Sequence, residues 1–290
     1  MAGLTTPVSA VPAARPRRGR PRLWRGLVLA GAVLYFLGPL AASTLFTLQA
    51  PRGGFSLRPY TEILGADGFL PSLLSSLELA AATIAAVLLL LVPAMLAVRL
   101  SLPRLRPVLE IVCSLPLVVP AIAMAAGIAT VLRWGPDHLA RTPFFQTVVA
   151  MQNPSFPVVL VLAYTVMALP LVHRALDAGL RAVDVRTLVE AARNCGASWT
   201  SALLRVVLPN LNRALLNASF LTLALVLGEF TVAQLLDFRT FTVWMVYARG
   251  SDAQLSVAVS LLSLLVTWAL LLVLSLIGGR RAAAHTPASE

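Results

Sequence analysis

Six long apolar runs constrain this chain more than any other feature of its sequence. They cover about 27–48, 72–98, 108–132, 158–176, 214–236 and 256–277. A helix crosses a bilayer with about 20 mostly apolar residues, so each run is long enough to span one. Only 12% of all residues are charged, whereas soluble domains carry about 25%. We therefore expect an all-α membrane protein with six transmembrane helices.

The basic residues orient these predicted spans. All 23 of them are arginines, and the formal net charge is +11. Seventeen lie in the termini and in the loops after the second and fourth spans, and six lie in the other three loops. Cytoplasmic loops are enriched in Arg and Lys, so both termini and the loop at about 177–213 are expected on the cytoplasmic side of the membrane. We interpret the positive charge as topology and contact with membrane lipid, not as nucleic-acid binding.

The predicted transmembrane domain covers residues 23–279, between two tails. Residues 1–22 are rich in Pro, Ala and Arg, and we expect a disordered basic tail there. Residues 280–290 form the expected cytoplasmic C-terminal tail. Basic residues before an apolar run also occur in signal peptides, but the run at 27–48 exceeds their usual apolar region of about 7–15 residues. We therefore expect a retained first span.

The loop segment 184–209 is too polar to cross a membrane and has the order of two short helices. Asp184 is placed to cap the first helix, and Gly196 stands where a left-handed residue is needed to end it. Ser198 is placed to cap the second helix, which Pro209 is expected to close because proline offers no N–H. Apolar residues recur at helical spacing in both helices: Val185, Leu188, Val189 and Ala192, then Trp199, Ala202, Leu203, Val206 and Val207. This pattern predicts a docking surface.

The spacing within segment 184–209 resembles the EAA loop of permease subunits in binding-protein-dependent ABC importers of the MetI-like type I fold. The segment reads Glu190-Ala191-Ala192, three residues, Gly196, nine residues, Val206 where Ile is commoner, one residue, then Leu208-Pro209. The resemblance covers the membrane region from about 27 to 277. It implies that a cytoplasmic helix couples to an ATPase through Asp184, Glu190, Ala191, Ala192, Gly196, Ala197, Leu208 and Pro209. The alternative is an amphipathic connector without a partner.

The resemblance also implies the partners of this chain. They are ABC ATPase subunits that bind the ATP, a second permease subunit, expected to be a different chain, and an extracytoplasmic solute-binding protein. A Gly-x-x-x-x-Gly-Lys-Ser/Thr phosphate loop is absent from the sequence, which contains no Lys. We therefore expect a transporter subunit that is not an enzyme, with no catalytic, cofactor or metal site of its own.

Two carboxylates, Glu78 and Glu229, fall inside predicted spans, where a charge is costly. They either line a translocation path that attracts a cationic solute, or are satisfied by interhelical hydrogen bonds or nearby head groups. The run Gly228-Glu229-Phe230-Thr231 resembles permeases of polyamine, ferric-ion, thiamine, sulfate and phosphonate importers. The resemblance makes a polyamine, spermidine or putrescine, the first expectation, with ferric ion, aminophosphonate and thiamine as alternatives.

Two other classes of membrane protein compete with this interpretation. A gradient-driven secondary transporter would carry buried carboxylates paired in a relay and an internal repeat of spans. Neither is visible in the sequence. A membrane scaffold without transport activity is disfavoured by the prolines inside the predicted spans, such as Pro116, Pro120 and Pro170.

Overall fold

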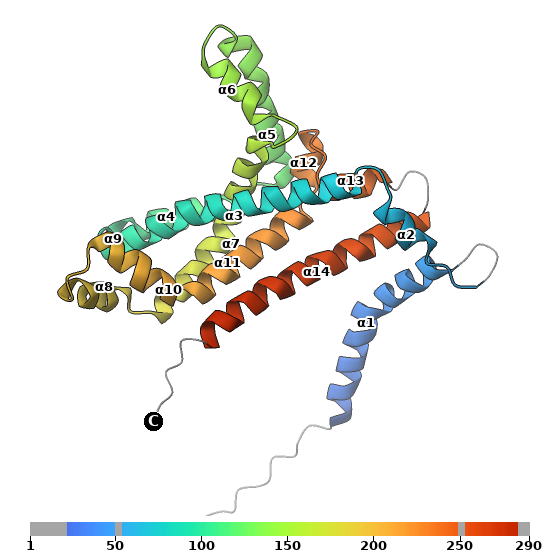
Figure 1. The fold of residues 1–290 in the computed structure, drawn as a ribbon, viewed down its shortest axis with the longest axis horizontal. Helices are drawn as coiled ribbons and strands as arrows, with labels where there is room; N and C mark the ends of the chain where they lie inside the picture. Colours follow the sequence, from blue (N-terminus) through green and yellow to red (C-terminus); the bar gives the residue numbers. More distant parts are fainter. Residues whose placement is uncertain (1–21, 50–53, 249–252, 284–290) are drawn as a thin grey trace, which may run out of the picture. The chain divides into compact units, whose positions relative to one another are not determined.

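The computed structural model describes residues 22–49, 54–248 and 253–283, and these residues are mainly α-helical (Figure 1). The chain divides into two units, residues 1–46 and 47–290. The first unit holds most of helix α1 (Arg22–Leu48), whose apolar side chains are largely exposed. Nearly all of the predicted N-terminal tail, and residues 284–290 of the predicted C-terminal tail, lie outside the described residues.

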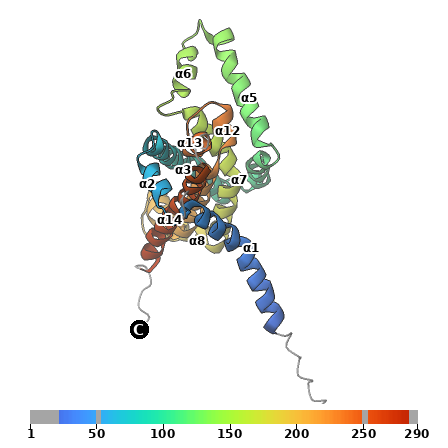
Figure 2. The same ribbon diagram turned by 90° about the vertical axis from the view of Figure 1, so that its right-hand side faces the viewer.

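The second unit is a bundle built on α3 (Phe69–Leu100), α7 (Val158–Ala182) and α11 (Asn212–Gly228), which all pack against one another. The long helix α14 (Ala253–Ala283) lies along α11. Figure 2 shows α3 nearly end-on. Helix α7 is central, because 56% of its apolar stretch is buried, against 28% for α3 and 11% for α14. A short helix, α2 (Arg58–Leu64), packs on α14.

Helices α7 and α11 come very close to each other at Gly179. A Cβ atom on Gly179 would collide with the Cβ of Ala214 in α11. Small residues let transmembrane helices come close, and within lipid it is this packing, rather than removal from water, that holds helices together. The Gly179–Ala214 contact therefore fixes α7 and α11 next to each other at the two ends of segment 184–209.

The third predicted span is broken into two helical halves. Helix α4 (Arg106–Ser114) and the 3-10 turn η2 (Leu115–Leu117) are followed by α5 (Ala121–Trp134), with a bend of 95° between the two halves. Pro120 at the break has an extended backbone, with φ −59° and ψ 142°. Proline disfavours the helical conformation of the residue before it and offers no N–H, so two prolines four residues apart end the first half. A π-helical turn, η3 (Gly135–Leu139), leads from α5 to α6 (Phe144–Met151).

The fifth predicted span also differs from the structure. It ends at Gly228 instead of about residue 236, because Glu229 adopts an extended backbone with φ −80° and ψ 129°. Two short helices follow, α12 (Thr231–Leu235) and α13 (Phe241–Ala248). In the described residues, four helices are long and apolar enough to cross a membrane, and six spans result if each bent pair counts as one.

Candidate functional site

The first half of segment 184–209 is helix α8 (Val185–Asn194), and Asp184 caps it as the sequence predicts. The Asp184 carboxylate accepts the backbone N–H of Thr187 at 3.3 Å and the hydroxyl of Thr187 at 2.7 Å. These two hydrogen bonds, the hydroxyl first, hold the pKa of the Asp184 carboxyl below its ordinary value. A carboxylate at this position also interacts favourably with the positive end of the helix dipole.

Gly196 ends α8 with a Schellman motif. Its φ is +85°, in the left-handed region. The Gly196 N–H donates to the Arg193 carbonyl at 2.9 Å, and the Ala197 N–H donates to the Ala192 carbonyl at 3.1 Å, which is the paired bonding of this cap. A Cβ on Gly196 would meet nothing within 4 Å. Glycine is therefore required here by the backbone conformation and not by crowding.

The second half of the segment is one continuous helical stretch with an irregular middle. Ser198 caps α9 (Trp199–Ala202) by accepting the Ser201 N–H at 3.3 Å. A π-helical turn, η4 (Leu203–Val207), and α10 (Leu208–Asn210) follow. Pro209 was expected to close this helix, but the helix continues through it to Asn210. It lies at the start of α10, just after the wide π turn, where a helix continues without a hydrogen bond from its N–H. The 71° bend into α11 comes at Leu211.

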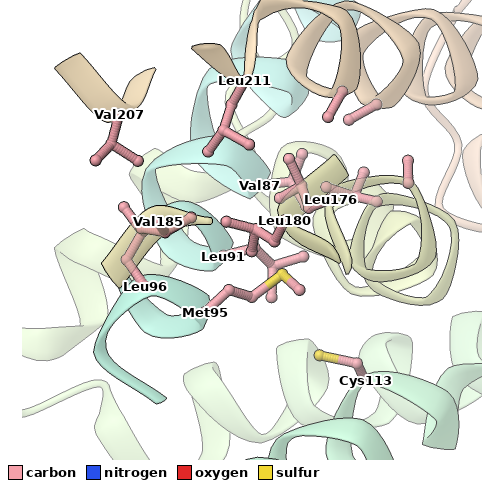
Figure 3. Close-up of a cluster of buried hydrophobic side chains, with 14 of the residues drawn as sticks. Val87, Leu91, Met95, Leu96, Cys113, Leu176, Leu180, Val185, Val207 and Leu211 are labelled. Atoms are coloured by element: carbon pink, nitrogen blue, oxygen red, sulfur yellow. The ribbon is translucent and has the colours of Figure 1, made fainter. Parts of the chain in front are cut away.

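One face of segment 184–209 is buried against the bundle. Val185, Val189, Ala202 and Val207, together with Leu211 just after the segment, join a single apolar cluster with side chains of α3 and α7 (Figure 3). The α3 and α7 members include Leu91, Met95, Leu96, Leu176 and Leu180. Displacing the segment would therefore displace the ends of α3 and α7, because close-packed side chains transmit strain.

The opposite face is exposed and carries most of the predicted coupling residues. The residues Asp184, Glu190, Ala191, Gly196 and Pro209 are exposed, whereas Ala192, Ala197 and Leu208 are half-buried. Among the described residues, Glu190 pairs only with Arg186 on the same helix, at 3.2 Å, and 65% of its side chain is exposed. An exposed pair of this kind is worth about 0–1 kcal/mol, so a partner could replace Arg186 at little cost.

Asp177, in the last turns of α7, joins three elements near this segment. Its Oδ2 accepts Arg181 at 2.6 Å, and its Oδ1 lies 3.8 Å from Arg99 at the end of α3 and 3.6 Å from Arg106 at the start of α4. Sequence reasoning did not single out Asp177. Only the Asp177–Arg181 spacing of four residues could have pointed to it, because the other two arginines come from distant parts of the chain.

Glu229 is buried, and its carboxylate accepts three hydrogen bonds. Its carboxylate accepts the backbone N–H groups of Val232 at 2.9 Å and Ala233 at 3.3 Å, and the hydroxyl of Tyr164 at 3.1 Å. Only 8% of the residue is exposed. The carboxylate thus caps α12 and ties it to α7, which is the geometry expected of an interhelical hydrogen bond.

Glu78 lies apart from this network on an exposed face of α3. Within the described part of the chain it forms neither a hydrogen bond nor an ion pair. The structure therefore does not pair Glu78 with Glu229, although both lie in apolar surroundings.

Comparison with known families identifies the class of this chain. The model of the family described as binding-protein-dependent transport system inner membrane component matches residues 90–280, which is well over half of the chain and includes α7, segment 184–209 and α11. Among curated proteins, no sequence matches it significantly. The helical membrane fold agrees with this family. The chain therefore belongs to the inner membrane components of binding-protein-dependent transport systems, the MetI-like permease subunits of ABC importers.

Proposed function

We propose that segment 184–209 is the EAA loop of this permease, the surface on which an ATPase subunit docks. The observation that carries the proposal is the two-sided character of α8. Val185 and Val189 are fixed in the same apolar cluster as α3 and α7, while Glu190 and Ala191 face outward. A helix that packs against the bundle on one side and is exposed on the other can transmit the movement of a partner to the bundle.

The residues of the segment have separate tasks in this proposal. Glu190 offers a charge to a basic group of the ATPase, and Ala191 lets the two surfaces come close. Gly196 sets the angle between α8 and α9 through its left-handed backbone. When ATP closes the ATPase dimer, α8 moves with it, and the spans rock between inward- and outward-facing states. ATP binds to the ATPase and not to this chain.

The movement has two routes into the bundle. The first is the apolar contact of Val185 and Val189 with the α3 and α7 side chains of the same cluster. The second is Asp177, which lies on the helix leading into α8 and is within 4 Å of arginines at the ends of α3 and α4. Both routes end on α3, so α3 is the helix we expect to respond most strongly to ATPase binding.

The remaining partners follow from the importer class. A second permease subunit, a different chain, completes the translocation path, and an extracytoplasmic solute-binding protein delivers the solute. The positive charge of the loops supports cytoplasmic termini and a cytoplasmic segment 184–209.

We propose a polyamine as the solute, with ferric ion, aminophosphonate and thiamine as the alternatives. The support is the Gly228-Glu229-Phe230 run together with Glu78, whose exposed carboxylate has no partner among the described residues. Because Glu229 is engaged in capping α12, Glu78 is the carboxylate available to a cation in the path. Uptake of labelled spermidine should fall in Glu78→Gln and remain normal in Glu62→Gln, which changes a carboxylate of α2.

Proteoliposomes test the coupling proposal. The chain is reconstituted with its permease partner and solute-binding protein, once with the ATPase and once without it. Uptake that requires both the ATPase and ATP supports coupling through segment 184–209. Uptake driven by an ion gradient in the absence of the ATPase would instead identify a secondary transporter.

A further inference from the structure

A cavity of about 210 Å³ lies at the end of the bundle that carries segment 184–209. It is formed by the end of α3, the connection to α4, and α7. Its polar wall consists of Arg99, Arg106, Glu110, His173 and Asp177, and Met95 and Leu109 contribute to its apolar wall. The cavity is distinct from the exposed face of α8 that we assign to the ATPase.

The two arginines of the cavity are incompletely satisfied. Asp177 Oδ2 is taken by Arg181, at 2.6 Å. Arg99 and Arg106 share the other oxygen at 3.8 Å and 3.6 Å, which is beyond hydrogen-bond distance. In the described residues neither guanidinium donates a hydrogen bond to any other group. Two guanidinium groups that converge on one atom and retain their donors are well suited to a phosphate, whose oxygens accept from both.

A second feature points to an amphipathic ligand. Glu110 also lines an open groove of about 360 Å³ along α4, whose other walls include Pro107, Ile111, Leu115 and Val118. The polar cavity therefore continues into an apolar surface at Glu110. A free phosphate would use only the cavity, whereas a phospholipid would fill the cavity with its head group and the groove with an acyl chain.

The two carboxylates select among head groups. Glu110 and Asp177 stand beside the phosphate position, so a head group with further negative charge would be repelled. A head group that carries an ammonium beside its phosphate can pair its amine with Glu110 and its phosphate with Arg99 and Arg106. Basic pockets between spans bind anionic lipid head groups, and the two carboxylates of this cavity shift that preference toward a head group that also carries an amine.

We propose that this cavity and groove form a specific site for a zwitterionic phospholipid, phosphatidylethanolamine. The site goes beyond the transport function and does not rest on it. A lipid held here would connect α3, α4 and α7 next to the helix that leads into α8.

Native mass spectrometry of the full-length chain in detergent tests the proposal. Phosphatidylethanolamine, phosphatidylglycerol and inorganic phosphate are titrated separately against the wild type and the variants. In Arg99→Gln/Arg106→Gln we expect phosphatidylethanolamine to bind about tenfold more weakly, the effect of losing a charge-assisted hydrogen bond. The matched control is Arg104→Gln, which removes a charge from the same connection without lining the cavity and should bind like the wild type.

A second variant keeps the test decisive if the double variant does not fold. Glu110→Gln retains both arginines, so it should keep its affinity for phosphatidylglycerol and lose the preference of the wild type for phosphatidylethanolamine. Equal loss of lipid in the Arg104→Gln control would overturn the proposal, as would a wild type without preference between the two lipids. Displacement of the lipid by inorganic phosphate at similar concentration would identify a free-phosphate site instead.

Discussion

Tyr164 in α7 donates its hydroxyl hydrogen to Glu229 Oε2 over 3.1 Å, joining residues 65 positions apart in the chain. The same carboxylate accepts two backbone N–H groups at the start of α12. The Thr242 hydroxyl donates to the Glu229 carbonyl at 2.6 Å. Glu229 therefore organises the break after α11, and its buried charge is compensated by three donors.

Tyr164→Phe tests this arrangement. Removal of the hydroxyl should lower the free energy of unfolding by about 1.5–3 kcal/mol, the usual loss for a hydrogen bond to a charged group. Thermal unfolding in detergent measures it, with Tyr35→Phe, an exposed tyrosine of α1, as the control. In a chain that already carries Glu229→Gln, Tyr164→Phe should lower the free energy of unfolding by less, because the two groups share one interaction. Strict additivity of the two substitutions would contradict the assignment.

Gly196→Val should abolish transport while leaving insertion into the membrane intact. A Cβ at this position meets nothing within 4 Å, so the expected defect comes from the left-handed backbone. That conformation costs about 1–2 kcal/mol in an ordinary residue with a Cβ and more in valine, because a β-branched residue at positive φ is a genuine outlier, so the native turn is lost. Uptake into proteoliposomes and the amount of membrane-inserted protein are the two measurements. Gly127→Val, at a helical position of α5 that also has open space, serves as the control, and normal transport by Gly196→Val would disprove the turn assignment.

Glu190→Lys should uncouple the ATPase from transport. The substitution reverses the charge offered to the partner and sets two positive side chains four residues apart with Arg186. ATP hydrolysis stimulated by the solute-binding protein measures the coupling. Glu62→Lys in α2 is a matched control, because Glu62 also pairs with an arginine four residues earlier, Arg58. If both variants lose stimulation equally, the effect is not specific to α8.

The cap of α8 should weaken only in acid. The pKa of the Asp184 carboxyl is lower in the folded protein than in the unfolded chain, so its stabilisation is present above the unfolded value of about 3.9 and is lost as the pH falls through the folded value. Hydrogen exchange at the Thr187 amide, corrected for its intrinsic rate, should therefore accelerate below about pH 4. Asp184→Asn keeps a cap acceptor that does not titrate and should lack this step. An identical acid step in the variant would assign it to another group.

The local features of segment 184–209 could be predicted from the sequence because they depend on neighbouring residues. Caps at Asp184 and Ser198 and the turn at Gly196 follow from rules that act over a few positions. The role of Glu229 could not be fixed in the same way, because its partner Tyr164 comes from another helix. The break at Glu229 was missed because the apolar run continues through it to about residue 236, and periodicity cannot detect a backbone that turns.

The arginine contacts of Asp177 also could not be predicted from the sequence, because they join distant parts of the chain. Arg99 and Arg106 were counted as topology signals, and their convergence on one carboxylate depends on how α3 and α4 pack against α7. Prolines in the third predicted span favour a bend, but the 95° break depends on the extended backbone at Pro120.

Thiol labelling of Cys195 tests the central claim most directly. Cys195 is exposed beside Gly196, whereas Cys113 is buried with 1% exposed, so the native chain carries a probe and an internal control. In membranes that hold the permease without the ATPase, a maleimide should label Cys195 rapidly. In the assembled complex, Cys195 should be protected. Cys113 should stay unlabelled both with and without the ATPase. Equal labelling of Cys195 with and without the bound ATPase would contradict docking on segment 184–209.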